Sequence, residues 1–261
     1  MHPLDLVDVL ILALIQGAAA VLPIDAGAHA QLLAHLTGWK AGSIIIAVQV
    51  GAMLALLLWL WRDVALIGQG LWKLRKARVE AGARLLGKAL IAAAPWIIAD
   101  SLLPPLGFRL LTAGLITVGC ALLMAAIDLM SMTVKRIEHL TPAEAALIGA
   151  LQWLALIPGV GRVAVALTTA RLIGLERPAA YRFMLLATLP VLLFGIGHNL
   201  FYFAAHGASP SGADLLTAAT SFTLVLAAVA LANAWISRAG LFFFAFYRFL
   251  VGALMIWLGV M

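Results

Sequence analysis

Two apolar stretches of the chain are each broken in mid-run by proline and glycine, and each break carries polar residues. The first break reads Leu22-Pro23-Ile24-Asp25-Ala26-Gly27-Ala28-His29, and the second reads Leu156-Ile157-Pro158-Gly159-Val160-Gly161-Arg162. At membrane depth, non-helical backbone is tolerated only where it is buried in protein or lines a wet cavity. Matched interruptions in the two halves of a chain indicate the working site of a membrane protein built from repeats. The two breaks are therefore expected to form the functional site.

The composition assigns the chain to the membrane. Hydrophobic residues make up 65% of the 261 residues and charged residues only 11%, whereas soluble domains carry roughly 25% charged residues. Apolar runs of about 20 residues recur, and such runs are long enough to cross a hydrocarbon core about 30 Å thick. We therefore predict an all-α polytopic membrane protein. The net charge of +6 is assigned to membrane topology, so no nucleic-acid partner is expected.

The apolar segments are predicted to be helical. The expected ranges are 4–22, 28–36, 43–61, 89–106, 108–127, 143–157, 163–173, 181–203, 213–236 and 241–259. The range 89–106 is the weakest, because Pro95 interrupts it and two further prolines end it. Segment 62–88 holds seven basic residues against two acids and is assigned to a cytoplasmic loop. Arg171, Arg177 and Arg182, which follow the second break, are assigned to loops on the same side.

Each broken segment is predicted to be a re-entrant helical hairpin. Residues 4–36 and 143–173 are too short to cross twice, since two crossings need about 40 residues. Three continuous transmembrane spans follow each hairpin, which gives two halves of inverted topology. We therefore predict a single membrane domain with two inverted repeats, 1–127 and 143–261. The two hairpin tips should meet near the bilayer midplane and enclose one polar site.

The second break has the features of an anion site. Arg162 follows Gly159 and Gly161 at the start of a short helix, and glycines let backbone amides approach a ligand closely. A helix N-terminus adds free N–H groups and partial positive charge, so the site suits a phosphate or pyrophosphate. An unpaired arginine within a span is costly, so Arg162 should have a partner. The alternative is that Arg162 snorkels, or pairs with Asp25, only to hold the fold.

The first break supplies two residues with more than one role. His29 can donate to a phosphate, accept a proton or act as a nucleophile, or it can be a structural histidine that bonds a backbone carbonyl. Asp25 is the only acid in either hairpin tip. Its carboxylate can bind a metal, pair with Arg162, or cap the short helix 28–36. The residues alone leave these alternatives open.

At these residues the chain resembles the undecaprenyl-diphosphate phosphatase (bacitracin-resistance) family of bacterial inner-membrane proteins. The family motifs run approximately E/Q-G-x-T-E-F-L-P-I/V-S-S-S/T-G-H and P-G-x-S-R-S-G-A-T, and they correspond to residues 16–29 and 158–166. Further matches lie at Gln49-Val50-Gly51, Trp61-Arg62, 183–190 and Tyr247-Arg248-Phe249. The resemblance covers the whole chain. It implies a location in the bacterial inner membrane and a polyprenyl phosphate or diphosphate lipid as the ligand.

Several motif residues differ from the family pattern. The differences are Ala20 in place of a glutamate, residues 25–27 in place of a hydroxyl-rich tripeptide, and Gly161, Val163 and Ala166 in place of two serines and a threonine. Gln16, His29 and Arg162 match the pattern. The anion-binding residues are thus retained. The acids and hydroxyls that the family uses in metal-assisted hydrolysis are mostly replaced, although the resemblance still implies a divalent cation.

Three functions are consistent with these residues. The first is a polyprenyl-diphosphate phosphatase in lipid-carrier recycling for cell-wall synthesis, and the second is a non-catalytic binder or transporter that moves a polyprenyl phosphate between leaflets. The third is a structural or regulatory membrane subunit. Bilayer lipids are expected partners, and a homodimer is an open alternative. The candidate residues are His29 and Asp25 for catalysis and Arg162, Gln16, Gly159 and Gly161 for substrate binding, with no metal ligand assigned.

Overall fold

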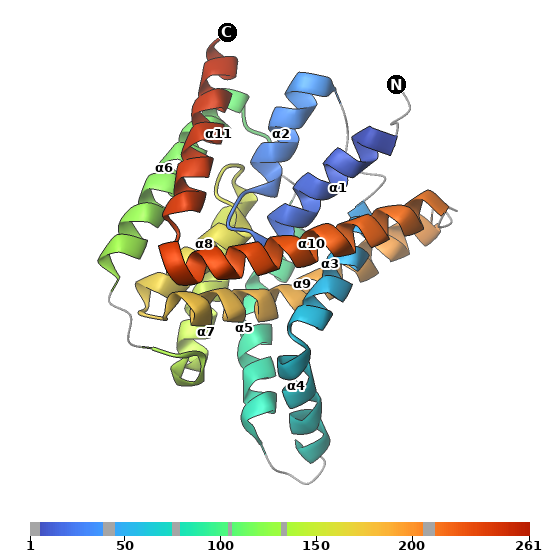
Figure 1. Ribbon diagram of the computed structural model, residues 1–261, viewed down its shortest axis with the longest axis vertical. Helices are drawn as coiled ribbons and strands as arrows, with labels where there is room; N and C mark the ends of the chain where they lie inside the picture. Colours follow the sequence, from blue (N-terminus) through green and yellow to red (C-terminus); the bar gives the residue numbers. More distant parts are fainter. Residues whose placement is uncertain (1–5, 39–44, 75–78, 104–105, 132–134, 206–211) are drawn as a thin grey trace.

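The computed structural model describes residues 6–38, 45–74, 79–103, 106–131, 135–205 and 212–261. Nearly all of these residues are helical (Figure 1). The α-helices are α1 (Leu6–Val21), α2 (Ala26–Thr37), α3 (Ile45–Trp59), α4 (Trp61–Leu74), α5 (Ala81–Leu102), α6 (Leu110–Met130), α7 (Pro142–Leu151), α8 (Arg162–Leu172), α9 (Arg177–Ala205), α10 (Gly212–Ala239) and α11 (Phe242–Val260). Short 3-10 helices are η2 (Ile137–His139) and η3 (Gln152–Leu156). The predicted all-α fold is confirmed.

The helix lengths define a multi-pass membrane protein. Five of the described helices are long and apolar enough to cross a bilayer, namely α5, α6, α9, α10 and α11. Helices α3 and α4 pass the same test together, as a pair bent by 82°. The two broken segments, α1–α2 and α7–α8, are built from shorter helices of 10 to 16 residues. The helix order is compatible with repeats at 1–127 and 143–261, and the inverted symmetry stays a prediction.

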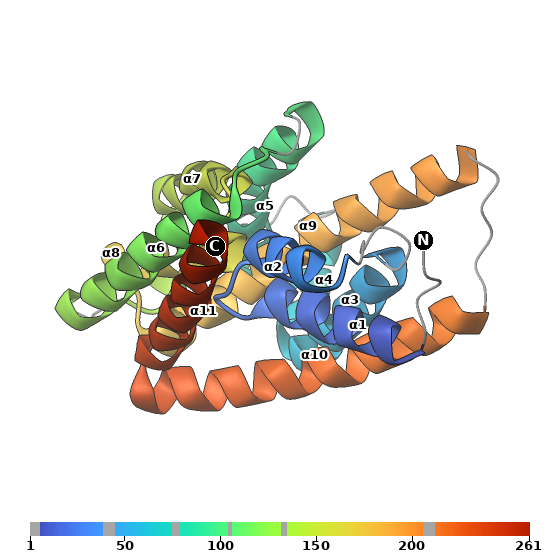
Figure 2. The same cartoon turned by 90° about the horizontal axis from the view of Figure 1, so that it is seen from above.

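The long helices pack in close pairs around the broken segments. Helix α6 lies along α11, and α10 lies along α3 (Figures 1 and 2). Glycine makes both contacts close. A Cβ on Gly114 of α6 would lie 2.9 Å from the Gly252 carbonyl oxygen of α11, and one on Gly51 of α3 would collide with the Ala218 backbone of α10. Small residues at helix contacts are typical of membrane proteins. Figure 2 shows α1 and α2 between the α6–α11 pair and α9.

The hydrophobic core is centred on α9. Residues 183–187 of this helix are buried at consecutive positions, as expected for a helix covered on all sides. Leu56 of α3, Met124 of α6 and Leu167 of α8 belong to the same cluster. The family match at 183–190 therefore lies largely in the core, where it supports the start of α8.

Helix α5 continues through Pro95, contrary to the interruption predicted there. It spans Ala81–Leu102, so it also begins earlier than the expected range 89–106. Proline in a helix removes one backbone hydrogen bond, and residues of η3 donate to carbonyls of this part of α5. Gln152 donates to the Ala92 carbonyl at 2.9 Å, and the Trp153 indole N–H donates to the Pro95 carbonyl at 2.5 Å. Tertiary contacts thus stabilise a helix that its own sequence disfavours.

The segment 62–88, predicted to be a loop, is largely helical. It forms most of α4 and the first turns of α5, which pack side by side (Figure 1). The contact is close because a Cβ on Gly70 or Gly82 would strike the backbone of the other helix. Asp63 of α4 is buried and forms a two-pronged ion pair with Arg182 of α9. A count of charges does not show that one of these acids is buried and paired with an arginine of another helix.

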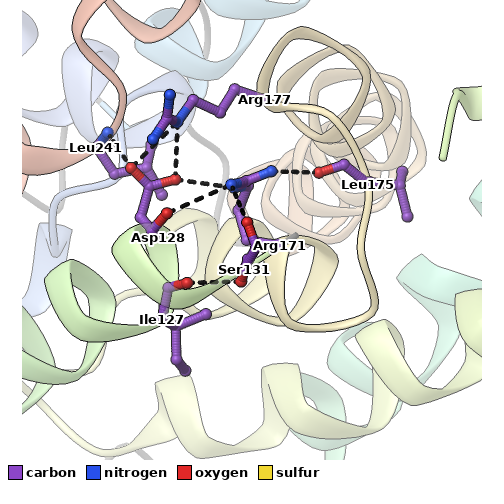
Figure 3. A network of polar contacts seen from close by, with 7 residues as sticks. All are labelled: Ile127, Asp128, Ser131, Arg171, Leu175, Arg177 and Leu241. Atoms are coloured by element: carbon purple, nitrogen blue, oxygen red, sulfur yellow. Dashed lines mark hydrogen bonds and ion pairs between the residues drawn. The ribbon is translucent and has the colours of Figure 1, made fainter. Parts of the chain in front are cut away.

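A buried ion-pair network joins helix ends at one side of the molecule (Figure 3). Asp128 of α6 accepts hydrogen bonds from Arg171 Nε at 2.8 Å, from Arg177 Nε at 3.0 Å and from the Leu241 N–H at 3.0 Å. Arg171 is only 1% exposed and also donates to the Leu175 carbonyl at 2.6 Å. The assignment of Arg171 to an exposed loop is therefore wrong, because Asp128 neutralises it in the interior.

Candidate functional site

The first break begins where α1 ends at Val21 and closes at the N-cap of α2. Asp25 is this N-cap, and its carboxylate accepts from the Gly27 N–H at 3.1 Å and the Ala28 N–H at 2.9 Å. A carboxylate here satisfies donors that the helix leaves unpaired and complements the helix dipole. Of the alternatives for Asp25, helix capping is confirmed.

The second break depends on two glycines in backbone conformations that other residues rarely adopt. Gly159 has φ 103° and Gly161 has φ 74°, and both values lie in the region that favours glycine. The Val160 N–H donates to the Ile157 carbonyl at 3.2 Å, and this hydrogen bond closes a turn directly after η3. Gly161 is then the N-cap of α8, and no side chain caps this helix within the described residues. The first N–H groups of α8 are thus open donors.

The two breaks contact one another directly, as predicted. Asp25 Oδ2 accepts a hydrogen bond from the Gly159 N–H at 2.6 Å. The backbones are packed so closely that a Cβ on Gly161 would lie 2.8 Å from the Ile24 carbonyl oxygen. Arg248 of α11 holds the second break from the other side, because its Nη2 donates to the Gly159 carbonyl at 2.6 Å and the Val160 carbonyl at 2.8 Å. The depth of this contact in the bilayer stays a prediction.

These contacts give the Asp25 carboxylate three hydrogen bonds. Its buried carboxylate accepts from three backbone N–H groups, two in its own helix and one across the contact. Within the described part of the chain, no ion pair joins Asp25 to Arg162. The alternative that these two residues pair to hold the fold is therefore wrong. Asp25 joins the two breaks through hydrogen bonds to backbone.

His29 lies one helical turn beyond Asp25 and is held at both ring nitrogens. Its Nδ1 is 2.5 Å from the Asp25 carbonyl oxygen, and its Nε2 is 2.8 Å from the Tyr247 hydroxyl of α11. The two rings are stacked, with centroids 5.7 Å apart and planes at 9°. Because a carbonyl can only accept, Nδ1 carries a proton. In the neutral ring, Nε2 is therefore the basic nitrogen.

Arg162 projects from the open end of α8 toward α9. Its Nη2 donates to the Thr188 hydroxyl oxygen at 3.2 Å, and Thr188 donates its own hydrogen to the Met184 carbonyl at 2.9 Å. No carboxylate of the described chain lies within ion-pair distance of Arg162. Asp100 of α5 attracts it electrostatically from farther away. A partly buried guanidinium with one neutral partner retains donors for an anion.

Gln16 is the predicted binding residue that the structure does not connect to this contact. It is partly buried in α1, and no hydrogen bond joins it to another described residue. The neighbouring Gly17 faces α10, since a Cβ there would touch Val225 and Ser221. The contact between the breaks thus brings together the backbones of Asp25, Gly159 and Gly161, with the side chains of His29 and Arg162 on its two sides.

The residues present do not fit a divalent-cation centre. Such a cation needs several oxygen ligands, mostly carboxylates, and the Asp25 carboxylate already accepts three N–H groups. Gln16 offers a neutral amide oxygen. In the described ranges, no group of three His, Cys, Asp or Glu side chains is placed to hold a metal. No step is therefore derived through the cation that the resemblance implies.

Three residues at the site were not among those predicted from the sequence. Arg248 carried a usable signal, because an arginine inside an apolar span needs a buried partner, and it stands in the matching Tyr247-Arg248-Phe249. Tyr247 belongs to the same match. Thr188 carried no signal, since threonine in a helix commonly bonds a carbonyl of its own helix, as Thr188 does.

The fold and the contact define the class as a polytopic membrane protein in which two interrupted helical segments meet at a polar site. The model of the bacitracin resistance protein BacA family matches residues 9–254. The chain therefore belongs to this family, and the resemblance drawn from the two motifs is confirmed.

Proteins named undecaprenyl-diphosphatase are similar over nearly the whole chain. Undecaprenyl-diphosphatase 1 of Rhodospirillum rubrum is 37% identical over 264 residues, which cover 95% of this chain and 93% of the relative. Undecaprenyl-diphosphatase 1 of Paramagnetospirillum magneticum is 36% identical over 245 residues, covering 88% and 89%. Undecaprenyl-diphosphatase of Alteromonas mediterranea is 30% identical over 266 residues, covering 97% and 98%. The similarity thus includes both broken segments.

Proposed function

We propose that this protein binds undecaprenyl diphosphate at the contact between its two breaks and hydrolyses it to the monophosphate. The names of the similar proteins supply the substrate. The observation that carries the proposal is the hydrogen bond between Asp25 and the Gly159 N–H. It joins the break that carries His29, one turn beyond Asp25, to the break that carries Arg162, at the start of α8.

The anion-binding half of the proposal rests on Arg162 and α8. Pyrophosphate carries its charge on oxygens that accept several hydrogen bonds at once. The uncapped N-terminus of α8 offers backbone donors, and Arg162 has guanidinium donors left after its bond to Thr188. Donors of these two kinds stabilise both bound phosphate and the charge that develops during transfer. Gly159 and Gly161 let the second break pack closely against its neighbours, which fixes the start of α8, and Gln16 is a further amide for binding.

The hydrolytic half rests on His29. As a general base, the His29 imidazole takes up a proton of the attacking water, and the water oxygen attacks the terminal phosphorus. The bridging P–O bond breaks, and the lipid monophosphate leaves as inorganic phosphate forms. Asp25 contributes to catalysis by position, because its carbonyl holds Nδ1 of His29 while its carboxylate holds the second break. Arg162 stabilises the charge on the transferred phosphoryl group.

A second candidate is a protein that binds a polyprenyl phosphate and moves it between leaflets without cleavage. Two observations favour it. Ala20 stands where the family motif has a glutamate, and the Asp25 carboxylate is occupied by backbone N–H groups. Binding needs the donors of Arg162 and α8, whereas hydrolysis also needs a base. The two candidates therefore differ in what His29 does.

Release of inorganic phosphate by the purified protein tests the proposal. The full chain in lipid nanodiscs is given undecaprenyl diphosphate, with and without a divalent cation. We expect saturable release that His29→Asn lowers by about 10²-fold or more and that Arg162→Ala also lowers strongly. No release, together with saturable thermal stabilisation by the lipid, would favour the transporter. Neither release nor stabilisation would leave only a structural or regulatory subunit.

The proposed substrate assigns the protein to the bacterial inner membrane, where the lipid carrier is recycled. Fractionation of the cell membranes tests this location. The contact between the breaks is made within one chain, so the proposed site does not require a homodimer. Mass measurement in nanodiscs would establish the oligomeric state.

A further inference from the structure

The hydrogen bond between His29 and Tyr247 joins residues that are 218 positions apart in the chain. His29 stands in the first turn of α2, and Tyr247 stands in α11. The phenol oxygen is 2.8 Å from Nε2, and the Asp25 carbonyl oxygen is 2.5 Å from Nδ1. The imidazole is thus held at both nitrogens by groups from different parts of the fold.

The direction of both hydrogen bonds follows from the chemistry of the partners. The Asp25 carbonyl has no hydrogen, so Nδ1–H donates to it. Nε2 of the neutral ring is then an acceptor, and the Tyr247 O–H donates to it. Turning the ring by half a turn would break both bonds. One tautomer and one orientation of His29 are therefore favoured over the others.

Tyr247 is itself fixed relative to the two breaks. The next residue, Arg248, is buried and donates to the carbonyls of Gly159 and Val160. Helix α11 is thus attached to the second break, while His29 is attached to the first through Asp25. Tyr247 is 38% exposed and His29 only 9%. The hydroxyl is therefore the more accessible member of the pair.

We propose that Tyr247 passes the proton of the attacking water to His29 in the phosphatase site. This inference rests on the proposed function. The Tyr247 O–H donates to the single lone pair of Nε2, so a water proton reaches this nitrogen through the phenol: the Tyr247 hydrogen moves to Nε2 while the phenol oxygen takes a proton from the water, whose oxygen attacks the phosphorus. The ring stack limits tilting of the imidazole, and the hydrogen bond limits its rotation. Outer partners of this kind commonly set the tautomer and orientation of a functional histidine.

Kinetics of Tyr247→Phe test the proposal, since phenylalanine keeps the ring stack and removes only the hydroxyl. We expect kcat for phosphate release from undecaprenyl diphosphate to fall about tenfold, as for the loss of one hydrogen bond. KM should change less than about twofold, because phosphate binding is assigned to Arg162 and α8. Tyr202→Phe makes the same chemical change on an exposed tyrosine of α9 and should leave kcat unchanged.

A double-mutant cycle separates a proton relay to His29 from a merely structural role. If Tyr247 acts through His29, the hydroxyl has no base to pass a proton to in His29→Gln, and Tyr247→Phe should lower the remaining activity no further. Equal effects of Tyr247→Phe in both backgrounds would overturn the proposal. Wild-type release that is unaffected by Tyr247→Phe would also overturn it. By contrast, a wild-type protein without any release would contradict the proposed function itself.

Nuclear magnetic resonance of protein carrying 15N-labelled histidine tests the pair without any activity. The His29 resonances are identified by their loss in His29→Gln. We expect a protonated Nδ1 and an unprotonated, hydrogen-bonded Nε2 at neutral pH in the wild type. In Tyr247→Phe the Nε2 resonance should move, whereas in Tyr202→Phe it should not. An unchanged Nε2 resonance in Tyr247→Phe would show that the hydroxyl does not hold His29.

Discussion

Helix α8 carries an arginine at each end, and the two have opposite environments. Arg171 at the C-terminal end donates to Asp128 and to the Leu175 carbonyl, and it is almost fully buried (Figure 3). Arg162 at the N-terminal end donates to one neutral hydroxyl. A buried cation whose donors are all satisfied stabilises the fold, and one whose donors are left over is available to an anion. Both residues are arginines, so residue type does not distinguish the two roles. The hydrogen-bond partners of each side chain do.

The largest expected effect is on the Asp128 network. Asp128→Asn keeps the size of the side chain and removes the charge that Arg171 and Arg177 share. Breaking a buried ion pair leaves an uncompensated buried charge and costs about 3–5 kcal/mol. Thermal unfolding in detergent should show a large drop in Tm. Glu80→Gln removes an acid from an exposed pair with Lys73 and should have little effect. Equal Tm values for the two variants would contradict the structural role of Asp128.

The next effect concerns the close packing of the two breaks. Gly161→Ala introduces a Cβ at φ 74°, 2.8 Å from the Ile24 carbonyl oxygen. Backbone strain at such a position costs about 1–3 kcal/mol, and the collision adds to it. Gly38 has the same φ of 74° but lies in the left-handed helical region, with ψ 6° and nothing within 4 Å, so Gly38→Ala measures the strain of a left-handed position without a collision. We expect a larger loss of Tm, and weaker lipid binding, only in Gly161→Ala.

Removing Arg162 should affect lipid binding more than stability. Arg162→Ala should weaken binding of undecaprenyl diphosphate by ~10-fold or more, since charge-assisted hydrogen bonds are lost. Its Tm should fall far less than that of Asp128→Asn, because no ion pair is broken. Arg162→Lys should recover part of the affinity, as a point charge lacks the planar fork. Arg136→Ala removes an exposed cation and serves as the control. Unchanged affinity in Arg162→Ala would refute the anion site.

The smallest effect is expected at Glu144, which begins the second broken segment. The hydrogen bond from Lys135 lowers the pKa of this carboxyl, and the Thr141 N–H lowers it further. A lowered pKa stabilises the fold above the ordinary value of 4.5, and this stability is lost as pH falls through the folded-state pKa. Glu144→Gln should cost about 0.5–1 kcal/mol at pH 7 and less at acidic pH. An equal loss of Tm in Glu144→Gln at pH 7 and at acidic pH would contradict this prediction.

The sequence predicted those features that depend on local composition. The breaks at 22–29 and 156–162, the short helices that follow them and the capping alternative for Asp25 all rest on proline, glycine and helix-cap preferences. These preferences act over a few residues. The mutual contact of the breaks was inferred from topology and is present.

The errors share one physical cause, which is a partner far away in the sequence. Helix α5 continues through Pro95, where Gln152 donates to the Ala92 carbonyl and Trp153 to the Pro95 carbonyl. Arg171 is not in a loop, because Asp128 neutralises it. The role of Tyr247 could not be read from its own segment, since His29 lies in the opposite half. Local patterns do not show which distant side chain will satisfy a buried group.

The same long separation affects how the protein is made. The Tyr247 hydroxyl that His29 bonds enters the chain 218 residues later, which takes about 10–40 s at a synthesis rate of 5–20 residues per second. Until Gly159 is made, 134 residues after Asp25, the first break has neither Gly159 nor Tyr247 to contact. Its polar groups must then be hydrated at the bilayer surface or in the insertion machinery. The proposed site therefore arises only when the last helix enters the membrane, and a nascent chain that stops before α11 lacks it.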